Sequence, residues 1–514
     1  MADAGTGLAE LWTADLFGTP EQPTHQSGFW RPLVLLGLRA EFWLTAGREL
    51  PLAWLGHVVT LLLHAVACVT LWRVLLALRL EGPTALLAAA LFAVHPVHPE
   101  TVAWLTSLGD LGAAACAWGA TALLLRPARP LAVTASAVVL LLAALLCKES
   151  AALLVALAAV LPWLAGTRAR AALVPPLVAV ALYGALRGLS FSHGIAAEAW
   201  TGPAGTAVRW WTWLSIVPDL LRLALWPGPP SPLRLVPAAT GWSAPGVLAG
   251  AAALVVLALL VLAAVRRRAP APSFALLLLL GTLAMLAPWV RFPIGYPEMA
   301  APLYERYLYA AAAAPAVALA WALQPLARRS RLAVAAGAGA LLLVLGAVTA
   351  SRAVAWRSDE SFARAGLAVS PRSPSLWTHL GVALLDKLRR DEDRSAGEEA
   401  LAAFERALQI DPDAPLAALD RFIALSLLGH DDQAEEAADR LLQRQPGDAL
   451  VLVNVAQWHM GHRRWDRAAA LLQQALATGR APPTAADDLA TCLQELAARA
   501  PPPVPAAPAA PRGG

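Results

Sequence analysis

The stretch Leu91-Phe-Ala-Val-His-Pro-Val-His-Pro-Glu-Thr-Val-Ala-Trp104, followed shortly by Asp110, separates two long apolar segments of the chain. Two histidines, a glutamate and an aspartate therefore lie where one apolar run ends and the next begins. Ionisable side chains are costly at the edge of a hydrocarbon layer, so a cluster of four predicts a functional site. The alternative is a polar, proline-rich bend between two membrane helices, with histidines that are merely hydrated. The spacing alone does not decide between the two.

The composition indicates a membrane domain followed by a soluble one. Of the 514 residues, 58% are hydrophobic and 15% are charged, whereas a soluble domain has about 25% charged residues. Apolar runs fill the chain up to about position 350, and the remainder is polar. This asymmetry predicts an all-α chain, in which a polytopic transmembrane helical bundle precedes a helical soluble domain. The four cysteines form no CxxC motif, and neither a metal site nor a cofactor is expected.

About ten membrane helices are expected, because a span needs about 20 apolar residues. We assign 1–50 to an exoplasmic interfacial segment and 51–352 to the multi-span membrane domain. The stretch 205–227 contains Arg209, Asp219 and Arg222, and it is expected to lie along the interface. The candidate spans are 52–79, 84–104, 110–126, 131–147, 150–166, 171–190, 246–265, 272–290, 306–325 and 332–350.

Basic clusters between the spans predict the orientation of the bundle. With the spans drawn above, all of the clusters fall on one side, which the positive-inside rule makes cytoplasmic. The opposite, exoplasmic face then collects the 95–110 turn, Lys148-Glu149, the loop that ends at Arg306 and the C-terminal domain. The clusters are Arg73/Arg79, Arg126/Arg129, Arg168/Arg170, Arg266/Arg267/Arg268 and Arg328/Arg329/Arg331.

Two pairs of adjacent opposite charges mark the ends of other spans. Lys148-Glu149 joins two apolar runs almost without a loop, and Glu305-Arg306 lies among tyrosines at the start of a span. Such pairs either face a polar cavity or neutralise themselves at a turn, and Arg306 could instead anchor an aromatic belt. An arginine fork can hold a phosphate, and a carboxylate can act as general base on a hydroxyl. Chemistry on a lipid-borne substrate is favoured over ion conduction, because the charges gather at one face.

A tetratricopeptide (TPR) array is predicted for 356–496. Ala400, Ala434 and Ala468 recur at a spacing of 34 residues, the TPR period. Other positions follow in the same phase: Phe404, Ala438 and Leu472, then Ala407, Leu441 and Ala475, then Pro412, Pro446 and Arg480. Arrays of this kind present a concave face to partner proteins.

The two ends of this array carry features of their own. The first unit contains Trp377-x-x-Leu380-Gly381, and a charged insertion at 389–395 is expected to lengthen its inter-helix turn. A half unit around Phe362 and Ala365 is expected to link the array to the membrane domain. Residues 500–514, rich in Pro and Ala, are expected to form a disordered tail.

Four sequence blocks, in order, resemble the protein O-mannosyltransferases that join a multi-span membrane domain to a TPR array. His95-Pro-Val-His98-Pro-Glu100-Thr-Val-Ala with Gly109-Asp110-Leu is similar to their HPVHTEAV…GRADLL. The other blocks are 12–18 with 30–33 (their DFWG…YRPL), 146–149 (LCKE) and 304–309 (AERYLY). The resemblance implies a GT-C-type membrane glycosyltransferase that moves a mannose-like sugar from a polyprenyl phosphate to Ser or Thr of a protein on the exoplasmic face.

With this resemblance, the predicted site contains four catalytic candidates and six substrate-binding candidates. Arg306 and Lys148 are assigned to the donor phosphate, and Asp110 or Glu100 to the sugar or to organising the site. The catalytic candidates are Asp15, His98, Glu100 and Asp110, and the substrate-binding candidates are Arg31, His95, Lys148, Glu149, Glu305 and Arg306.

The implied partners are a polyprenyl-phosphate-linked sugar, the lipid bilayer and an acceptor protein or peptide in the TPR groove, without nucleic acid. A composition rich in Ala, Leu and Arg favours a multi-pass protein of the bacterial inner membrane with a periplasmic TPR domain, and hence an undecaprenyl carrier.

One departure from the family pattern concerns the catalytic acid. The family has a further membrane helix and an acidic pair ahead of the block that corresponds to Trp12, whereas only Asp3 and Glu10 precede Trp12 here. We therefore expect an N-terminally truncated chain, with the acid that performs the chemistry upstream of Met1. The alternative function is a non-catalytic, membrane-anchored TPR scaffold for envelope or export assembly.

Overall fold

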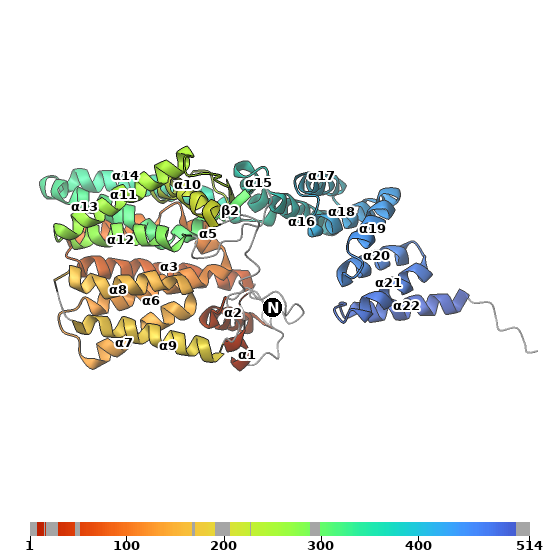
Figure 1. The fold of residues 1–514 in the computed structure, drawn as a ribbon, viewed down its shortest axis with the longest axis horizontal. Helices are drawn as coiled ribbons and strands as arrows, with labels where there is room; N and C mark the ends of the chain where they lie inside the picture. The colour runs from red at the N-terminus through yellow and green to blue at the C-terminus, as the bar shows by residue number, and fades with distance from the viewer. Residues whose placement is uncertain are drawn as a thin grey trace, which may run out of the picture. The chain divides into compact units, whose positions relative to one another are not determined.

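The computed structural model describes residues 8–14, 16, 29–46, 52–166, 170–190, 206–226, 228–287 and 299–499. The chain divides into two compact units, 1–371 and 372–514, and each is described by itself (Figure 1). The helices of the first unit are α1 (Leu8–Thr13), α2 (Pro32–Thr45), α3 (Leu52–Ala77), α4 (Gly82–Ala93), α5 (His98–Ala103), α6 (Leu108–Leu124), α7 (Leu131–Cys147), α8 (Ala152–Leu164), α9 (Val174–Ser190), α10 (Thr206–Leu225), α11 (Pro245–Arg266), α12 (Pro270–Met285), α13 (Ala313–Arg329), α14 (Arg331–Ala353) and α15 (Asp359–Val369).

The described part of the first unit contains five helices that are long and apolar enough to cross a membrane. Large apolar side chains on them face outward, for example Leu259 of α11 (60% exposed) and Leu343 of α14 (77%), as expected where a helix contacts lipid. The five helices are Ala53–Ala77, Ala171–Ser190, Pro245–Arg266, Ala310–Arg329 and Arg331–Trp356, and shorter apolar helices are Gly82–Ala93, Leu131–Cys147, Glu149–Leu164 and Pro270–Met285. The predicted membrane character is therefore supported, while the number of spans stays a prediction.

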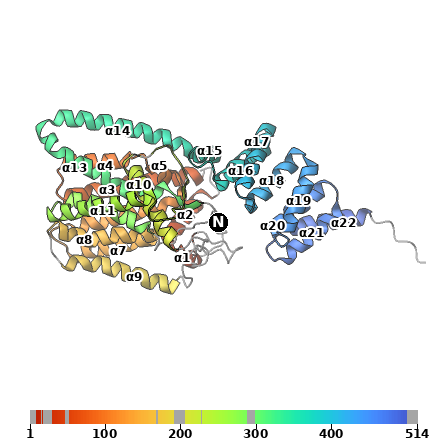
Figure 2. The same cartoon turned by 45° about the horizontal axis from the view of Figure 1, so that its top comes forward.

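Helix α6 forms the centre of the first unit. It packs against α3, α7 and α8, and it buries residues on all of its sides, including Leu111, Trp118 and Leu124. A helix that is apolar all round belongs in the interior of a bundle. Helix α14 instead runs along the outside, over α13 and α4, and reaches α5 at its C-terminal end (Figure 2).

The stretch predicted as one span at 84–104 is broken in the structure. Helix α4 ends at Ala93, and the short α5 begins only at His98. Pro96 and Pro99 explain the break, because proline lacks the backbone donor and pushes the preceding residue out of the helical region. A turn with polar side chains therefore stands where the long helix was expected.

The stretch 205–227, which was expected to lie along the interface, contains α10. This helix packs against α11 and buries Val217, Leu220 and Leu223. Gly250 of α11 permits the close approach, since a Cβ at this position would lie 1.8 Å from the carbonyl oxygen of Leu214. One side of α10 thus belongs to the core, and its position relative to a membrane stays a prediction.

Among the described residues, a short antiparallel ribbon accompanies the helices of the predicted all-α fold. Strand β1 (Arg234–Pro237) pairs with β2 (Met299–Leu303), with Arg234 opposite Leu303. The hydroxyl of Ser370, which follows α15, donates to Leu233 O at 2.9 Å and accepts from Leu235 N at 3.1 Å. The half unit expected before Pro371 is therefore α15, held in the first unit by the edge of this ribbon.

The second unit is the predicted helical solenoid. Its helices are α16 (Pro374–Asp391), α17 (Arg394–Ile410), α18 (Pro415–Leu428), α19 (Asp431–Arg444), α20 (Ala449–Gly461), α21 (Trp465–Ala477) and α22 (Thr484–Arg499). The three periodic alanines Ala400, Ala434 and Ala468 are fully buried, and a Cβ on Gly381 would lie 2.4 Å from the Phe404 ring. Small residues therefore sit where paired helices pack closely. Residues 500–514, the predicted tail, lie outside the described residues.

The charged insertion at 389–395 was expected to lengthen the inter-helix turn. In the structure it lengthens helix α16 instead. Helix α16 continues to Asp391, and it has 18 residues where α18 has 14. Glu392 then adopts a left-handed conformation with a φ of 53°, which reverses the chain before α17. The insertion is therefore absorbed as an additional helical turn.

Asp420 in α18 gives the solenoid a pH-dependent stability. Burial raises the pKa of this carboxyl from 3.8 to about 6, although Arg389 opposes the shift. Since the folded chain keeps the proton over this interval, the free energy of unfolding should fall as the pH rises from about 4 to about 6. Above about pH 6 the buried carboxyl is ionised, and the free energy of unfolding should fall no further on its account.

Asp420→Asn should remove this cost and stabilise the solenoid at neutral pH by about 1–2 kcal/mol, allowing for partial solvent screening. Thermal unfolding of the full chain at pH 4.5 and 7.5 measures the effect. Asp413, which is 93% exposed, provides the control Asp413→Asn, for which no change is expected. Equal behaviour of the two variants at pH 7.5 would contradict the prediction.

Candidate functional site

The two adjacent charges Lys148 and Glu149 do not neutralise each other. Lys148 Nζ donates to Asp110 Oδ1 at 2.5 Å, and Arg31 Nε donates to Glu149 Oε2 at 2.9 Å. Lys148 follows the end of α7, Asp110 lies in the first turn of α6, and Arg31 precedes α2. The dipeptide thus connects three helix ends through two ion pairs.

The Lys148–Asp110 pair depends on a close approach of α6 and α7. A Cβ on Gly109 would lie 2.7 Å from the Cys147 carbonyl oxygen, and one on Gly112 would lie 3.0 Å from Cys147 Sγ. The two glycines therefore let the first turn of α6 pack against the last turn of α7. The paired side chains are only 11% and 14% exposed, so each charge is partly desolvated and needs the other.

Glu305 and Arg306 also take separate partners. Glu100 Oε1 accepts from Arg306 Nη1 at 2.5 Å, and Glu100 Oε2 accepts from the Arg306 backbone N–H at 3.1 Å. The Arg306 guanidinium lies 3.7 Å from the centre of the Tyr304 ring and 4.2 Å from that of Trp104. The aromatic residues around Arg306 thus hold its charge beside Glu100 through cation–π contacts.

Glu305 accepts from two arginines that the sequence interpretation did not include. Arg234 Nη2 donates to Glu305 Oε1 at 2.8 Å, and Arg352 Nη2 donates to Glu305 Oε2. Arg352 is 4% exposed, and it also donates to the carbonyl oxygens of Pro96, at 2.7 Å, and Gly228. The signal that could have identified Arg352 is an arginine in the last turn of a long apolar helix.

The two histidines of the 95–98 turn, His95 and His98, are buried. His98 packs its ring against Phe92 and Tyr309, with centroids 4.6 and 4.8 Å away. His64 of α3 adds to the cluster, since its Nδ1 lies 2.8 Å from the Tyr309 hydroxyl and its Nε2 lies 3.1 Å from Ala93 O. His95 Nδ1 accepts from Val97 N at 3.3 Å, within the turn. The structure thus places both histidines against buried aromatic and backbone groups.

The electrostatic field links the Lys148 and Arg306 pairs. Burial lowers the pKa of Lys148; Asp110 opposes this shift, while both Arg31 and Arg306 add to it. Burial also raises the pKa of Glu100 to about 7 against the effect of Arg306. Arg31 and Arg306 therefore both act on Lys148 through their positive charge, and each of the three cations is paired with its own carboxylate.

Two further acids, Asp15 and Glu41, complete the set of acidic residues considered for the site. Asp15, predicted as catalytic, lies outside the described residues. Glu41, which was taken only as a charge that interrupts an interfacial helix and not as a site residue, is 4% exposed in α2, and burial raises its pKa. The signal that could have identified it is a carboxylate within an otherwise apolar stretch. Nine of the ten predicted site residues are thus described, and all except His95 and His98 take part in ion pairs.

Arg352→Met should destabilise the first unit strongly. The change removes the donors to Pro96, Gly228 and Glu305, and breaking a buried ion pair costs about 3–5 kcal/mol. Thermal unfolding of the full chain in detergent measures the loss. Arg328, whose pair with Glu81 is exposed, provides the control Arg328→Met, with an expected effect of about 0.5 kcal/mol or less. Similar losses in the two variants would contradict a structural role for Arg352.

Comparison with known proteins supports the resemblance drawn from the motifs. The chain is 36% identical over 162 residues to Protein O-mannosyl-transferase Tmtc1 of Drosophila melanogaster, which covers 28% of this chain and 16% of that protein. It is 38% identical over 112 residues to Protein O-mannosyl-transferase Tmtc2 of the same organism, covering 22% and 12%. It is 36% identical over 121 residues to Protein O-mannosyl-transferase TMTC4 of Homo sapiens, which covers 21% of this chain and 16% of that protein. The matched stretches thus span about a sixth of these relatives or less.

Two further comparisons concern the fold. A family model described as a tetratricopeptide repeat matches residues 393–452, which lie within the predicted array. Among solved structures, the crystal structure of APC/C hetero-tetramer Cut9-Hcn1 has a TM-score of 0.25 and 14% identity, covering 80% of this chain and 83% of that one. In the stretches that match, the chain is homologous to protein O-mannosyl-transferases, and it carries the TPR array that its periodicity predicts.

Proposed function

We propose that the chain is an integral membrane glycosyltransferase that moves a mannose-like sugar from a polyprenyl-phosphate donor to Ser or Thr of a protein on the exoplasmic face. The observation that carries this proposal is the pairing of Lys148 with Asp110 and of Arg306 with Glu100 at one end of the bundle. Both cations are held in place by hydrogen bonds before any substrate binds. The homology to protein O-mannosyl-transferases supports the same class of reaction.

Lys148 and Arg306 would hold the donor phosphate. Lys148 has three N–H donors, and Arg306 has five in a planar fork. The contact of Arg306 with Glu100 through Nη1 and the backbone N–H leaves side-chain donors for a phosphate. Charge develops on the departing phosphate as the bond to the sugar breaks, and two fixed cations stabilise that charge.

Among the catalytic candidates within this sequence, Asp110 is the carboxylate that would act as the general base, in the role that the family pattern gives to an acid ahead of Trp12. When Lys148 turns towards the phosphate, it releases the Asp110 carboxylate, which can then accept the proton of the acceptor hydroxyl. The hydroxyl oxygen forms the new bond to the anomeric carbon, the carbon–oxygen bond to the phosphate breaks, and polyprenyl phosphate leaves. Glu100 and Glu305 would keep Arg306 and Arg352 in position, and the buried histidines would support the turn that carries Glu100.

The solenoid would bind the acceptor protein or a partner, as concave helical arrays do. We place it on the exoplasmic side, because the basic clusters of the first unit predict that the opposite face is cytoplasmic. The bacterial inner membrane and an undecaprenyl carrier remain the expectation from composition.

Asp110→Asn should reduce sugar transfer by about 10²–10⁴-fold, the usual contribution of a general base. Arg306→Ala should reduce it by about 10²–10³-fold, as for loss of one group that stabilises developing charge. Transfer of labelled mannose from a polyprenyl phosphate to a Ser/Thr peptide by the purified chain measures both. The control is Asp219→Asn, at an exposed pair with Arg222, which should leave transfer unchanged.

The alternative is a membrane-anchored TPR scaffold, in which the same ion pairs only fix the helix ends. It is favoured by the fact that the described acids of the predicted site all have cationic partners. Transfer at the wild-type level by Asp110→Asn and Arg306→Ala would show that the site is misplaced. A wild-type chain that folds and transfers nothing, while its solenoid still binds protein, would establish the scaffold instead.

A further inference from the structure

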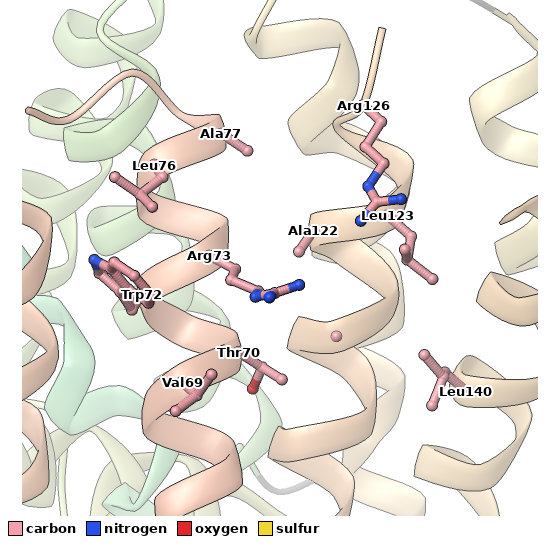
Figure 3. A pocket seen from close by; sticks show the side chains of 11 residues that line it. Val69, Thr70, Trp72, Arg73, Leu76, Ala77, Ala122, Leu123, Arg126 and Leu140 are labelled. Carbon is pink, nitrogen blue, oxygen red and sulfur yellow. The ribbon is translucent and has the colours of Figure 1, made fainter. Parts of the chain in front are cut away.

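A groove of about 610 Å³ opens between α3, α6 and α7, away from the candidate site. Its volume falls within the range of small-molecule sites, roughly 300–1,000 Å³. Figure 3 shows Val69 and Leu76 on α3, Ala122 and Leu123 on α6, and Leu140 of α7 on the far side of α6 from α3. The lining is mostly apolar, as expected for a site that receives a hydrocarbon chain.

Small residues create the space between the helices. Gly119 and Ala122 of α6 stand opposite Thr70 and Ala77 of α3 along the groove. A Cβ on Gly119 would lie 3.6 Å from both Thr70 Cγ2 and Leu140 Cδ1, which is ordinary contact. A larger side chain at position 119 would therefore enter the groove without displacing backbone.

Two arginines provide positive charge in this groove. Arg73 extends from α3 into the space between the helices, and the side chain of Arg126, just after α6, runs back along α6 towards Leu123 (Figure 3); both arginines line the groove. Both side chains are exposed, and within the described residues neither has an ion pair. An apolar trough with two free cations complements a ligand that has an anionic head and an apolar tail.

The groove and the candidate site lie at opposite ends of α6. Asp110 is in the first turn of this helix, and Arg126 follows its end. A helix of 17 residues is roughly 25 Å long at 1.5 Å per residue, close to the thickness of a hydrocarbon core. Arg73 and Arg126 belong to the basic clusters that predict the cytoplasmic face, whose lipids carry negative charge.

We propose that this groove binds an anionic phospholipid of the cytoplasmic leaflet, with its phosphate between Arg73 and Arg126 and one acyl chain along the apolar lining. A phospholipid is proposed as the occupant because Arg73 and Arg126 belong to the predicted cytoplasmic face, where anionic phospholipids are present. The site acts as a fixed lipid contact that positions α3 against α6. The proposal needs only a membrane-embedded bundle, and it holds whether or not the chain transfers sugar.

Native mass spectrometry of the full chain in detergent tests the site, with phosphatidylglycerol and phosphatidylcholine of identical acyl chains as probes. The wild type should bind one phosphatidylglycerol more tightly than phosphatidylcholine. Arg73→Ala with Arg126→Ala should weaken phosphatidylglycerol binding roughly 30-fold, since each arginine near a lipid headgroup contributes about fivefold. Gly119→Leu should also abolish this preferred binding, because it fills the groove and leaves the charges unchanged.

The matched control is Arg267→Ala with Arg268→Ala, which removes two exposed arginines of the same predicted face at the end of α11. This variant should bind phosphatidylglycerol like the wild type. Unfolding temperatures confirm that all variants are folded. The proposal fails if the control loses as much binding as the groove variant, if Gly119→Leu binds normally, or if phosphatidylcholine binds the wild type equally well.

Discussion

The structure of the first unit depends on the cost of burying a charge at the end of an apolar helix. Such a charge is tolerated when an opposite charge meets it with good geometry. Lys148 and Glu149 meet Asp110 and Arg31, and Glu305 and Arg306 meet Arg352 and Glu100. Each dipeptide therefore joins two different partners. The helix ends are connected through side chains, and the positions of the cations are fixed by the requirement that none is left unpaired.

The backbone prepares this arrangement. Prolines end α4 before the 95–98 turn, and Gly109 lets α6 approach the Cys147 carbonyl so that Asp110 reaches Lys148. Arg352 completes the arrangement, since it crosses from α14 to the carbonyl oxygen of Pro96 and to Glu305. A polar site is thus built from residues far apart in the sequence, at one end of α6. The lipid groove that we propose lies at the other end.

Local signals in the sequence predicted the solenoid and the apolar helices of the first unit, except at 84–104. The 34-residue period placed Ala400, Ala434 and Ala468 at buried helix contacts, and the charged dipeptides at 148–149 and 305–306 marked helix ends that form ion pairs. The partners in the ion pairs could not be predicted from the sequence, because residues such as Arg352 and Glu305 are brought together only by the tertiary fold. The β1–β2 ribbon was missed since both strands are short and pair across about 60 residues of chain, where local patterns carry no information. Hydropathy predicted one continuous helix at 84–104, but the prolines at 96 and 99 break it.

The most direct test of the account compares Lys148→Met, Asp110→Leu and their combination, with unfolding and sugar transfer measured on the same preparations. Each single change leaves one buried charge without its partner and should cost about 3–5 kcal/mol, whereas the neutral pair should recover most of that stability. Transfer should remain absent in the combined variant, because the phosphate-binding cation and the base are both gone. Wild-type stability in both single variants, or transfer by the combined variant, would contradict the account.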